Sequence, residues 1–163
     1  MNSEQLNIEF LSVKDAAYRY AVALLHDTAE AEDAVQDLYE RLWRRRLLLR
    51  RLGFRSLVMT SIRNAALDRL RERERRRCES IDAVAAESVE MEDRRDEVAL
   101  IKRIIARLPD REREVIHLRD VEGIAFEDIA EVVGCSEAAA RMAHSRARQK
   151  VKDEFSKTMN YGV

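Results

Sequence analysis

Residues 121–151 read VEGIAFEDIAEVVGCSEAAARMAHSRARQKV and contain the clearest folding signal in the chain. The apolar residues of FEDIAEVV (126–133) recur at helical spacing over about two turns. Gly134 permits a tight turn, and Ser136 can cap the next helix by accepting hydrogen bonds from its early amides. We therefore predict a helix-turn-helix whose second helix spans about residues 137–155.

The second helix of this motif is a candidate nucleic-acid-binding element. In helix-turn-helix proteins this helix enters the major groove, with its first residues near base edges and flanking cations on phosphates. The polar and basic residues that share one of its faces at spacings of three or four are Arg141, His144, Ser145, Arg148 and Lys152. This stretch alone leaves open an ordinary helical hairpin with a solvated basic face, because the pattern is common by chance.

The rest of the chain shows further helical patterns and few turn signals. Four glycines and one proline stand against many Ala, Leu, Glu and Arg residues, which favour helices. Ser56 is a candidate N-cap, and Pro109 can stand in the first turn of a helix. Apolar periodicity predicts further helices over residues 4–25, 29–46, 56–77, 98–108 and 109–123. We expect an all-α fold.

Periodicity fades between residues 78 and 97, which read CESIDAVAAESVEMEDRRDE and contain few large apolar side chains. We interpret this acidic stretch as a linker between two small helical domains. The first domain would comprise residues 1–77, and the second, which contains the helix-turn-helix, residues 98–163.

Charge is segregated along the chain, although the formal net charge is only -1. Residues 1–40 and 78–97 are acidic, whereas residues 41–77 contain fourteen arginines, no lysine and three acids. Such a basic block attracts polyanions, and the acidic blocks attract cationic partners. A charged helix face can also be simply a solvated surface. A basic block that contains arginine and no lysine instead favours fork-like contacts with phosphate or carboxylate.

Two predicted helices present polar stripes opposite their apolar faces. On the helix over 29–46, Ala31, Val35, Leu38 and Leu42 share one side. The other side of that helix shows Asp33, Gln36, Asp37 and Glu40. The helix over 56–77 similarly points Arg63, Asn64, Asp68 and Arg71 outward.

Several functional classes lack support in the sequence. No run approaches the roughly 18 to 20 apolar residues of a membrane span, and the N-terminus lacks a signal-peptide pattern, so we expect a cytoplasmic protein without membrane insertion. The histidines and cysteines (His26, His117, His144, Cys78 and Cys135) show no metal-ligand spacing. We expect neither a metal nor another cofactor, and no enzymatic activity.

Taken together, these features resemble an extracytoplasmic-function sigma factor, a group of the bacterial sigma-70 family that keeps only regions 2 and 4. AEAEDAVQDLYERLW (29–43) is similar to region 2.2, which docks on the β′ clamp of RNA polymerase. FRSLVMTSIRNAALDRLRERERRR (54–77) resembles regions 2.3 and 2.4, which melt and read the -10 element. Residues 105–151 resemble region 4, which reads the -35 element.

The resemblance implies partners and residue roles. It implies three partners: core RNA polymerase, promoter DNA and an anti-sigma factor. The polymerase would be bound through its β′ clamp and β flap, and anti-sigma factors are often membrane proteins. The residues that would contact polymerase are Asp33, Gln36, Asp37 and Glu40. Those that would contact the -10 element are Arg63, Asn64, Asp68 and Arg71. Those that would contact the -35 element are Ser136, Arg141, His144, Ser145, Arg148 and Lys152. A stand-alone helix-turn-helix regulator is the alternative, which leaves the arginine block and the acidic helix unexplained.

Overall fold

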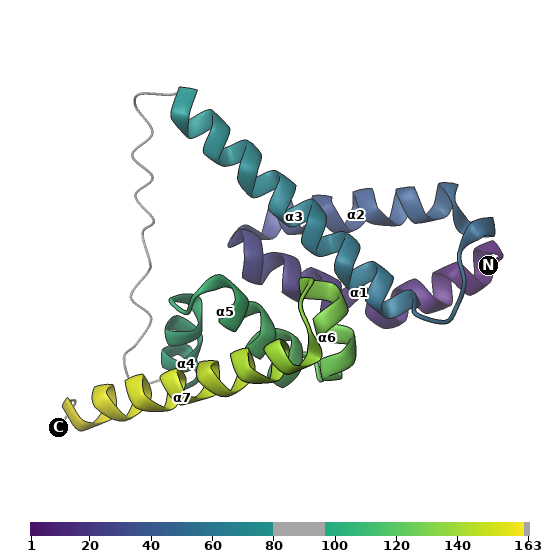
Figure 1. The fold of residues 1–163 in the computed structure, drawn as a ribbon. Helices are drawn as coiled ribbons and strands as arrows, with labels where there is room; N and C mark the ends of the chain where they lie inside the picture. Colours follow the sequence, from purple (N-terminus) through teal and green to yellow (C-terminus); the bar gives the residue numbers. More distant parts are fainter. Residues whose placement is uncertain (80–96, 162–163) are drawn as a thin grey trace. The chain divides into compact units, whose positions relative to one another are not determined.

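The computed structural model describes residues 1–79 and 97–161. These residues form α-helices, a short 3-10 turn and a π turn, and they contain no β-strand. The expected all-α fold is therefore confirmed for the described part of the chain. Two compact units are present, one formed mainly by the residues before 80 and the other mainly by the residues after 96 (Figure 1).

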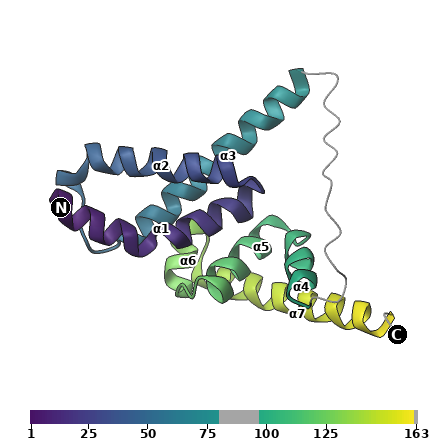
Figure 2. The ribbon, with the colours of Figure 1, turned by 180° about the vertical axis from the view of Figure 1, so that it is seen from behind.

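The first unit consists of helices α1 (Ser3–Leu25), α2 (Thr28–Arg44) and α3 (Phe54–Glu79). Helix α2 folds back beside α1, and α3 packs against both, as Figures 1 and 2 show. Side chains from all three helices fill the core; its large, fully buried members include Leu6, Tyr20, Leu25, Leu38, Met59 and Ile62. The last turns of α3 extend beyond the other two helices, and their side chains are exposed.

The reversal between α1 and α2 uses two capping residues. His26 adopts a left-handed conformation (φ 53°), and its N–H donates to the Val22 carbonyl at 2.8 Å. Asp27 then begins α2 by accepting a hydrogen bond from the Glu30 N–H at 2.9 Å. The two helices can therefore lie antiparallel.

The start of α3 differs from the sequence-based prediction. The helix begins at Phe54, after Gly53 in a left-handed conformation (φ 74°), and the Leu57 N–H donates to the Gly53 carbonyl at 3.0 Å. Ser56 is buried within the first turn, so the prediction that it is the N-cap is wrong. Burial of Phe54 in the core explains the earlier start.

The second unit contains α4 (Glu97–Ala106), α5 (Asp110–Ile116), a π turn (His117–Val121), α6 (Phe126–Val133) and α7 (Glu137–Tyr161). Helices α4 and α5 pack against α7. A buried cluster of Leu108, Ile116 and Ala147 joins α5 and the turn between α4 and α5 to α7.

Two boundaries differ from expectation in this part of the chain. Helix α7 continues to Tyr161, six residues beyond the predicted end near Phe155. Of the predicted linker over 78–97, Cys78 and Glu79 belong to α3 and Glu97 begins α4, while residues 80–96 lie outside the described residues.

Candidate docking and nucleic-acid surfaces

Helix α2 presents the acidic stripe predicted from its periodicity. Its buried face comprises Ala31, Ala34, Val35, Leu38 and Leu42. Asp33, Gln36, Asp37 and Glu40 are all exposed, so the four predicted docking residues share the solvent side of one helix. An exposed acidic helix face of this kind can bind a basic helical surface through charge complementarity.

One residue of this stripe is already engaged within the first unit. An Asp37 carboxylate oxygen accepts a hydrogen bond from Arg69 of α3 at 2.9 Å, and the Arg69 side chain is 28% exposed. Asp33 and Glu40 have no hydrogen bond or ion pair within residues 1–79 and 97–161. The stripe therefore contains both a residue that joins α2 to α3 and acids that are available to a partner.

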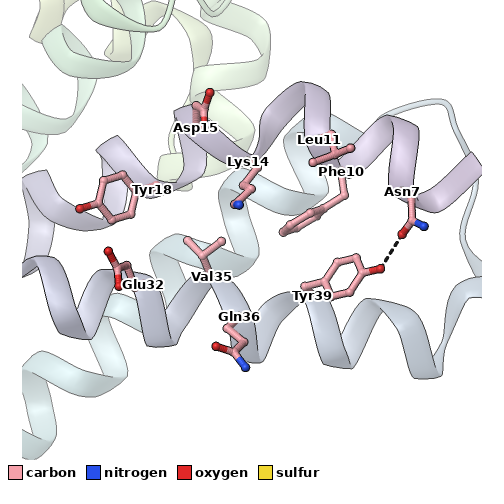
Figure 3. A pocket seen from close by; sticks show the side chains of 10 residues that line it. All are labelled: Asn7, Phe10, Leu11, Lys14, Asp15, Tyr18, Glu32, Val35, Gln36 and Tyr39. Atoms are coloured by element: carbon pink, nitrogen blue, oxygen red, sulfur yellow. Dashed lines mark hydrogen bonds between the residues drawn. The ribbon is translucent and has the colours of Figure 1, made fainter.

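A pocket of about 670 Å³ lies between α1 and α2, beside this stripe (Figure 3). Phe10, Leu11, Val35 and Tyr39 supply apolar surface, and the rings of Phe10 and Tyr39 lie 4.9 Å apart between their centroids. The Tyr39 hydroxyl donates to the side-chain oxygen of Asn7, which fixes the ring across the two helices. Gln36 also lines the pocket, so the polar stripe borders an apolar hollow.

The predicted -10 residues lie on α3, with different exposure. Asn64, Asp68 and Arg71 are exposed, whereas Arg63 is half-buried. Arg71 donates to Asp68 at 3.1 Å across one turn. The four side chains therefore lie along one helix, and the acid Asp68 holds Arg71.

Most arginines in the C-terminal half of α3 are bound within the protein. Arg73 donates to the Leu25 carbonyl at 2.9 Å and pairs with Glu30, so it ties α3 to the end of α1 and the start of α2. Arg75 and Arg76 both donate to Glu72. The hydrogen bond from Arg75, with the positive charges of both arginines, holds the pKa of Glu72 below its usual range.

The turn of the helix-turn-helix confirms the predicted capping pattern. Gly134 is left-handed (φ 71°), and the Cys135 N–H donates to the Ala130 carbonyl at 3.0 Å. The Ser136 hydroxyl accepts a hydrogen bond from the Ala139 N–H at 3.1 Å and thereby caps α7. Ser136 thus has a structural role at the start of the helix predicted to enter DNA.

The predicted -35 residues on α7 occupy two environments. Arg141, Ser145, Arg148 and Lys152 are exposed. His144 is turned toward the π turn, where its Nε2 lies 2.9 Å from Asp120, and its side chain is only 13% exposed. The exposed residues are therefore better placed than His144 to contact a ligand.

The sequence pattern did not indicate a role for three residues near the exposed face of α7, namely Phe126, Arg119 and Asp120. Phe126 begins α6, and the guanidinium carbons of Arg119 and Arg141 lie 4.7 and 4.6 Å from its ring centroid. Asp120, from the π turn, holds His144. Helical periodicity could not identify this cluster, because the π turn changes which residues face α7.

Metal binding and membrane spanning find no support in the described residues. Within residues 1–79 and 97–161, no three His, Cys, Asp or Glu side chains gather as a metal site would require. No helix there is both long and apolar enough to cross a bilayer.

Two family models match the chain, one for each unit. Sigma-70 region 2 matches residues 10–76, and Sigma-70 region 4 matches residues 99–151. The RNA polymerase sigma-H factor of Pseudomonas aeruginosa is 30% identical over 145 residues, covering 80% of this chain and 75% of that protein. The chain belongs to the sigma-70 family.

Other similar proteins support membership in the extracytoplasmic-function (ECF) group of sigma factors. The probable RNA polymerase sigma factor RfaY of Xanthomonas campestris is 31% identical over 145 residues, covering 83% of this chain and 36% of that protein. Relatives named as ECF RNA polymerase sigma factors are also among the matches. The chain spans about a third of the length of the first curated relatives it matches. The expected membership in the extracytoplasmic-function group is confirmed.

A solved sigma factor has the same fold. The structure of RpoE from Bartonella quintana, in complex with the anti-sigma factor NepR, has a TM-score of 0.76 and 25% identity, and covers 94% of this chain and 98% of that one. By these matches α1, α2 and α3 correspond to region 2, and α4 through most of α7 corresponds to region 4.

Proposed function

We propose that this chain is an RNA polymerase sigma factor that binds core RNA polymerase and directs promoter-specific initiation of transcription. The observation that carries the proposal is the presence of both sigma-70 regions, in order, in one chain. Such a factor binds and positions macromolecules, and covalent chemistry belongs to the polymerase. We therefore propose that the chain is not an enzyme and that it acts in the cytoplasm.

The acidic stripe of α2 is the proposed polymerase-binding face. Asp33, Gln36 and Glu40 are exposed, and Asp37 contributes charge while it also bonds Arg69. A basic coiled coil such as that of the β′ clamp would complement this charge. The apolar pocket beside the stripe would add contact area that charge alone does not provide.

Two separate surfaces would bind promoter DNA. Arg63, Asn64, Asp68 and Arg71 of α3 are the proposed contacts for the -10 element. On the -35 side the proposed contacts are Ser136, Arg141, His144, Ser145, Arg148 and Lys152, with Ser136 acting mainly through the helix cap and His144 through its bond to Asp120.

Neither surface needs to bind DNA tightly by itself. When both are held on polymerase, the second contact becomes intramolecular, which can strengthen binding by factors of about 100 to 10,000. Residues 78–97 would serve as the tether between the domains over 1–77 and 98–163, and so would set the distance between the two promoter elements.

An anti-sigma factor is the proposed regulator. The similar RpoE of Bartonella quintana was solved with such a partner, NepR. A protein that covers the α2 stripe and its neighbouring pocket would prevent polymerase binding directly. The regulator and core polymerase should therefore compete for the chain.

The test is binding of the full chain to purified bacterial core RNA polymerase. We expect saturable binding that Glu40→Arg weakens at least tenfold, because the change reverses an exposed charge that has no described partner. Glu4→Arg, an equal charge reversal in the first turn of α1, is the matched control and should leave binding nearly unchanged. No binding by folded wild-type protein would overturn the proposal in favour of a stand-alone DNA-binding regulator.

A further inference from the structure

Phe126 lies at the centre of a cluster of side chains, and the proposed function assigns no role to Phe126 itself. It is the first residue of α6 and is half-buried. Its ring centroid lies 4.7 Å from the guanidinium carbon of Arg119 and 4.6 Å from that of Arg141. The ring of His144 meets it edge-on, with centroids 5.3 Å apart. Three cationic or imidazole side chains from two elements thus converge on one aromatic ring.

The ring is itself fixed by the π turn. Arg119, from that turn, contacts Phe126 and also donates to the Ile124 carbonyl at 3.0 Å. Asp120, from the same turn, holds His144 against the ring through a 2.9 Å contact. The surroundings of Phe126 therefore restrict its movement before any ligand binds.

Arg141 rests on this fixed ring in a defined orientation. Its Nη2 donates to Glu137 at 2.8 Å and its Nε to the same oxygen at 3.2 Å, while the guanidinium lies over Phe126. An arginine normally loses side-chain freedom when it binds a base or phosphate. If the side chain is already ordered, binding costs less and the orientation of the guanidinium fork is selected in advance.

We propose that Phe126 is a positioning residue that orders Arg141 for sequence-specific contact with promoter DNA. The proposal rests on the proposed function, because it assumes that α7 reads DNA. In this role Phe126 acts through Arg141, whose guanidinium lies over its ring, and needs no contact of its own with DNA. Arg119 and His144 support the ring, which gives His144 a role that its low exposure allows.

The experiment uses the full chain bound to core polymerase and a pool of duplexes randomised in the upstream promoter region. Sequencing of bound DNA gives the base preference at each position for wild type, Phe126→Leu, Phe126→Tyr and Arg141→Ala. We expect Phe126→Leu to reduce preference roughly two- to tenfold at the positions where Arg141→Ala reduces it, the range that a cation–π contact supports. Phe126→Tyr keeps the ring and should retain the preference.

Double variants separate positioning from a general structural effect. In the Arg141→Ala background, Phe126→Leu should cause no further loss, because the side chain that it positions is already absent. In the Arg148→Ala background it should cause its full loss, because Arg148 is exposed and the cations stacked on the ring within residues 1–79 and 97–161 are Arg119 and Arg141. Thermal unfolding checks that each variant folds, and Phe126→Met replaces Phe126→Leu if the latter does not.

Each result decides between the two proposals. An equal loss from Phe126→Leu with and without Arg141 would overturn positioning and leave only a structural role for the ring. An effect of Arg141→Ala without any effect of Phe126→Leu would overturn the positioning role alone. No effect of Arg141→Ala, or no preference by wild type, would overturn both the positioning role and the DNA contacts proposed for α7.

Discussion

The C-terminal half of α3 and the helix α7 carry similar basic side chains in different electrostatic settings. On α3, Arg73 bonds Leu25 and Glu30, and Arg75 bonds Glu72 and Glu79. On α7, Arg148 and Lys152 are exposed and have no hydrogen bond or ion pair within residues 1–79 and 97–161. The number of arginines in a segment therefore overstates the positive charge that the segment can offer to DNA.

The basic residues of α3 and those of α7 therefore have different roles. The arginines of α3 stabilise the region 2 helices. When DNA binds, they would keep part of their contacts with carboxylates and give up only the rest for phosphate. On α7, Arg148 and Lys152 have no hydrogen bond or ion pair within residues 1–79 and 97–161 to lose when they meet phosphate, whereas Arg141 pairs with Glu137.

Arg73→Ala should destabilise region 2 by about 1–2 kcal/mol, because it removes a charged hydrogen bond to the Leu25 carbonyl and the pair with Glu30. Thermal unfolding of the full chain measures the change. Arg77→Ala is the matched control, since Arg77 is exposed and its contact with Glu74 is 4.0 Å long. Equal losses from the two variants would show that Arg73 does not tie the helices together.

Removing both Arg148 and Lys152 should flatten the salt dependence of DNA binding by the polymerase-bound chain. The slope of log affinity against log salt should fall by about 0.9 for each lost phosphate contact. The matched variant replaces Arg75 and Arg76, which already bind Glu72, and should change the slope less. If replacing Arg75 and Arg76 changed the slope more than replacing Arg148 and Lys152, the arginines of α3 would be the more available to DNA, which contradicts the prediction.

Ser136→Ala should destabilise region 4 by about 1 kcal/mol, because the Ala139 N–H loses the acceptor that caps α7. Ser136→Asp supplies another acceptor and should retain most of the stability. The measurement is thermal unfolding, followed by DNA selection with the same proteins. If both variants unfold like wild type, the cap does not contribute to the stability of region 4.

The smallest expected effect concerns Glu72 and pH. Arg75 and Arg76 lower the pKa of this carboxyl in the folded protein, so its contribution to stability is present above the pKa that the carboxyl has in the unfolded chain. That contribution is lost as pH falls through the lower folded pKa. Circular dichroism between pH 7 and 3 should show that Glu72→Gln lacks this part of the acid dependence. An unchanged acid profile would contradict the pairing.

The sequence predicted most helices because apolar residues recur at helical spacing in each. It also predicted the left-handed Gly134 and the Ser136 cap, which depend on local residue types. It placed the start of α3 incorrectly, because burial of Phe54 depends on neighbours that are distant in sequence.

The candidate surfaces were predictable to a similar degree. Exposure of the acidic stripe follows from helix geometry, and the structure places all four of its residues on the solvent side. The pair between Asp37 and Arg69 and the contacts of Phe126 with Arg119 and Arg141 join separate elements. Such contacts depend on how helices pack, and a helical period along one chain segment does not contain that information.

The most direct test of the central claim is transcription by core polymerase with this chain on a library of randomised promoters. A sigma factor predicts transcripts that require the chain, with start sites on templates that share sequence at two separated elements. Arg141→Ala should relax the upstream element, and Asn64→Ala the downstream one. If the chain binds core polymerase but produces no chain-dependent start sites, or if both variants relax the same element, the account of two divided DNA-binding surfaces is contradicted.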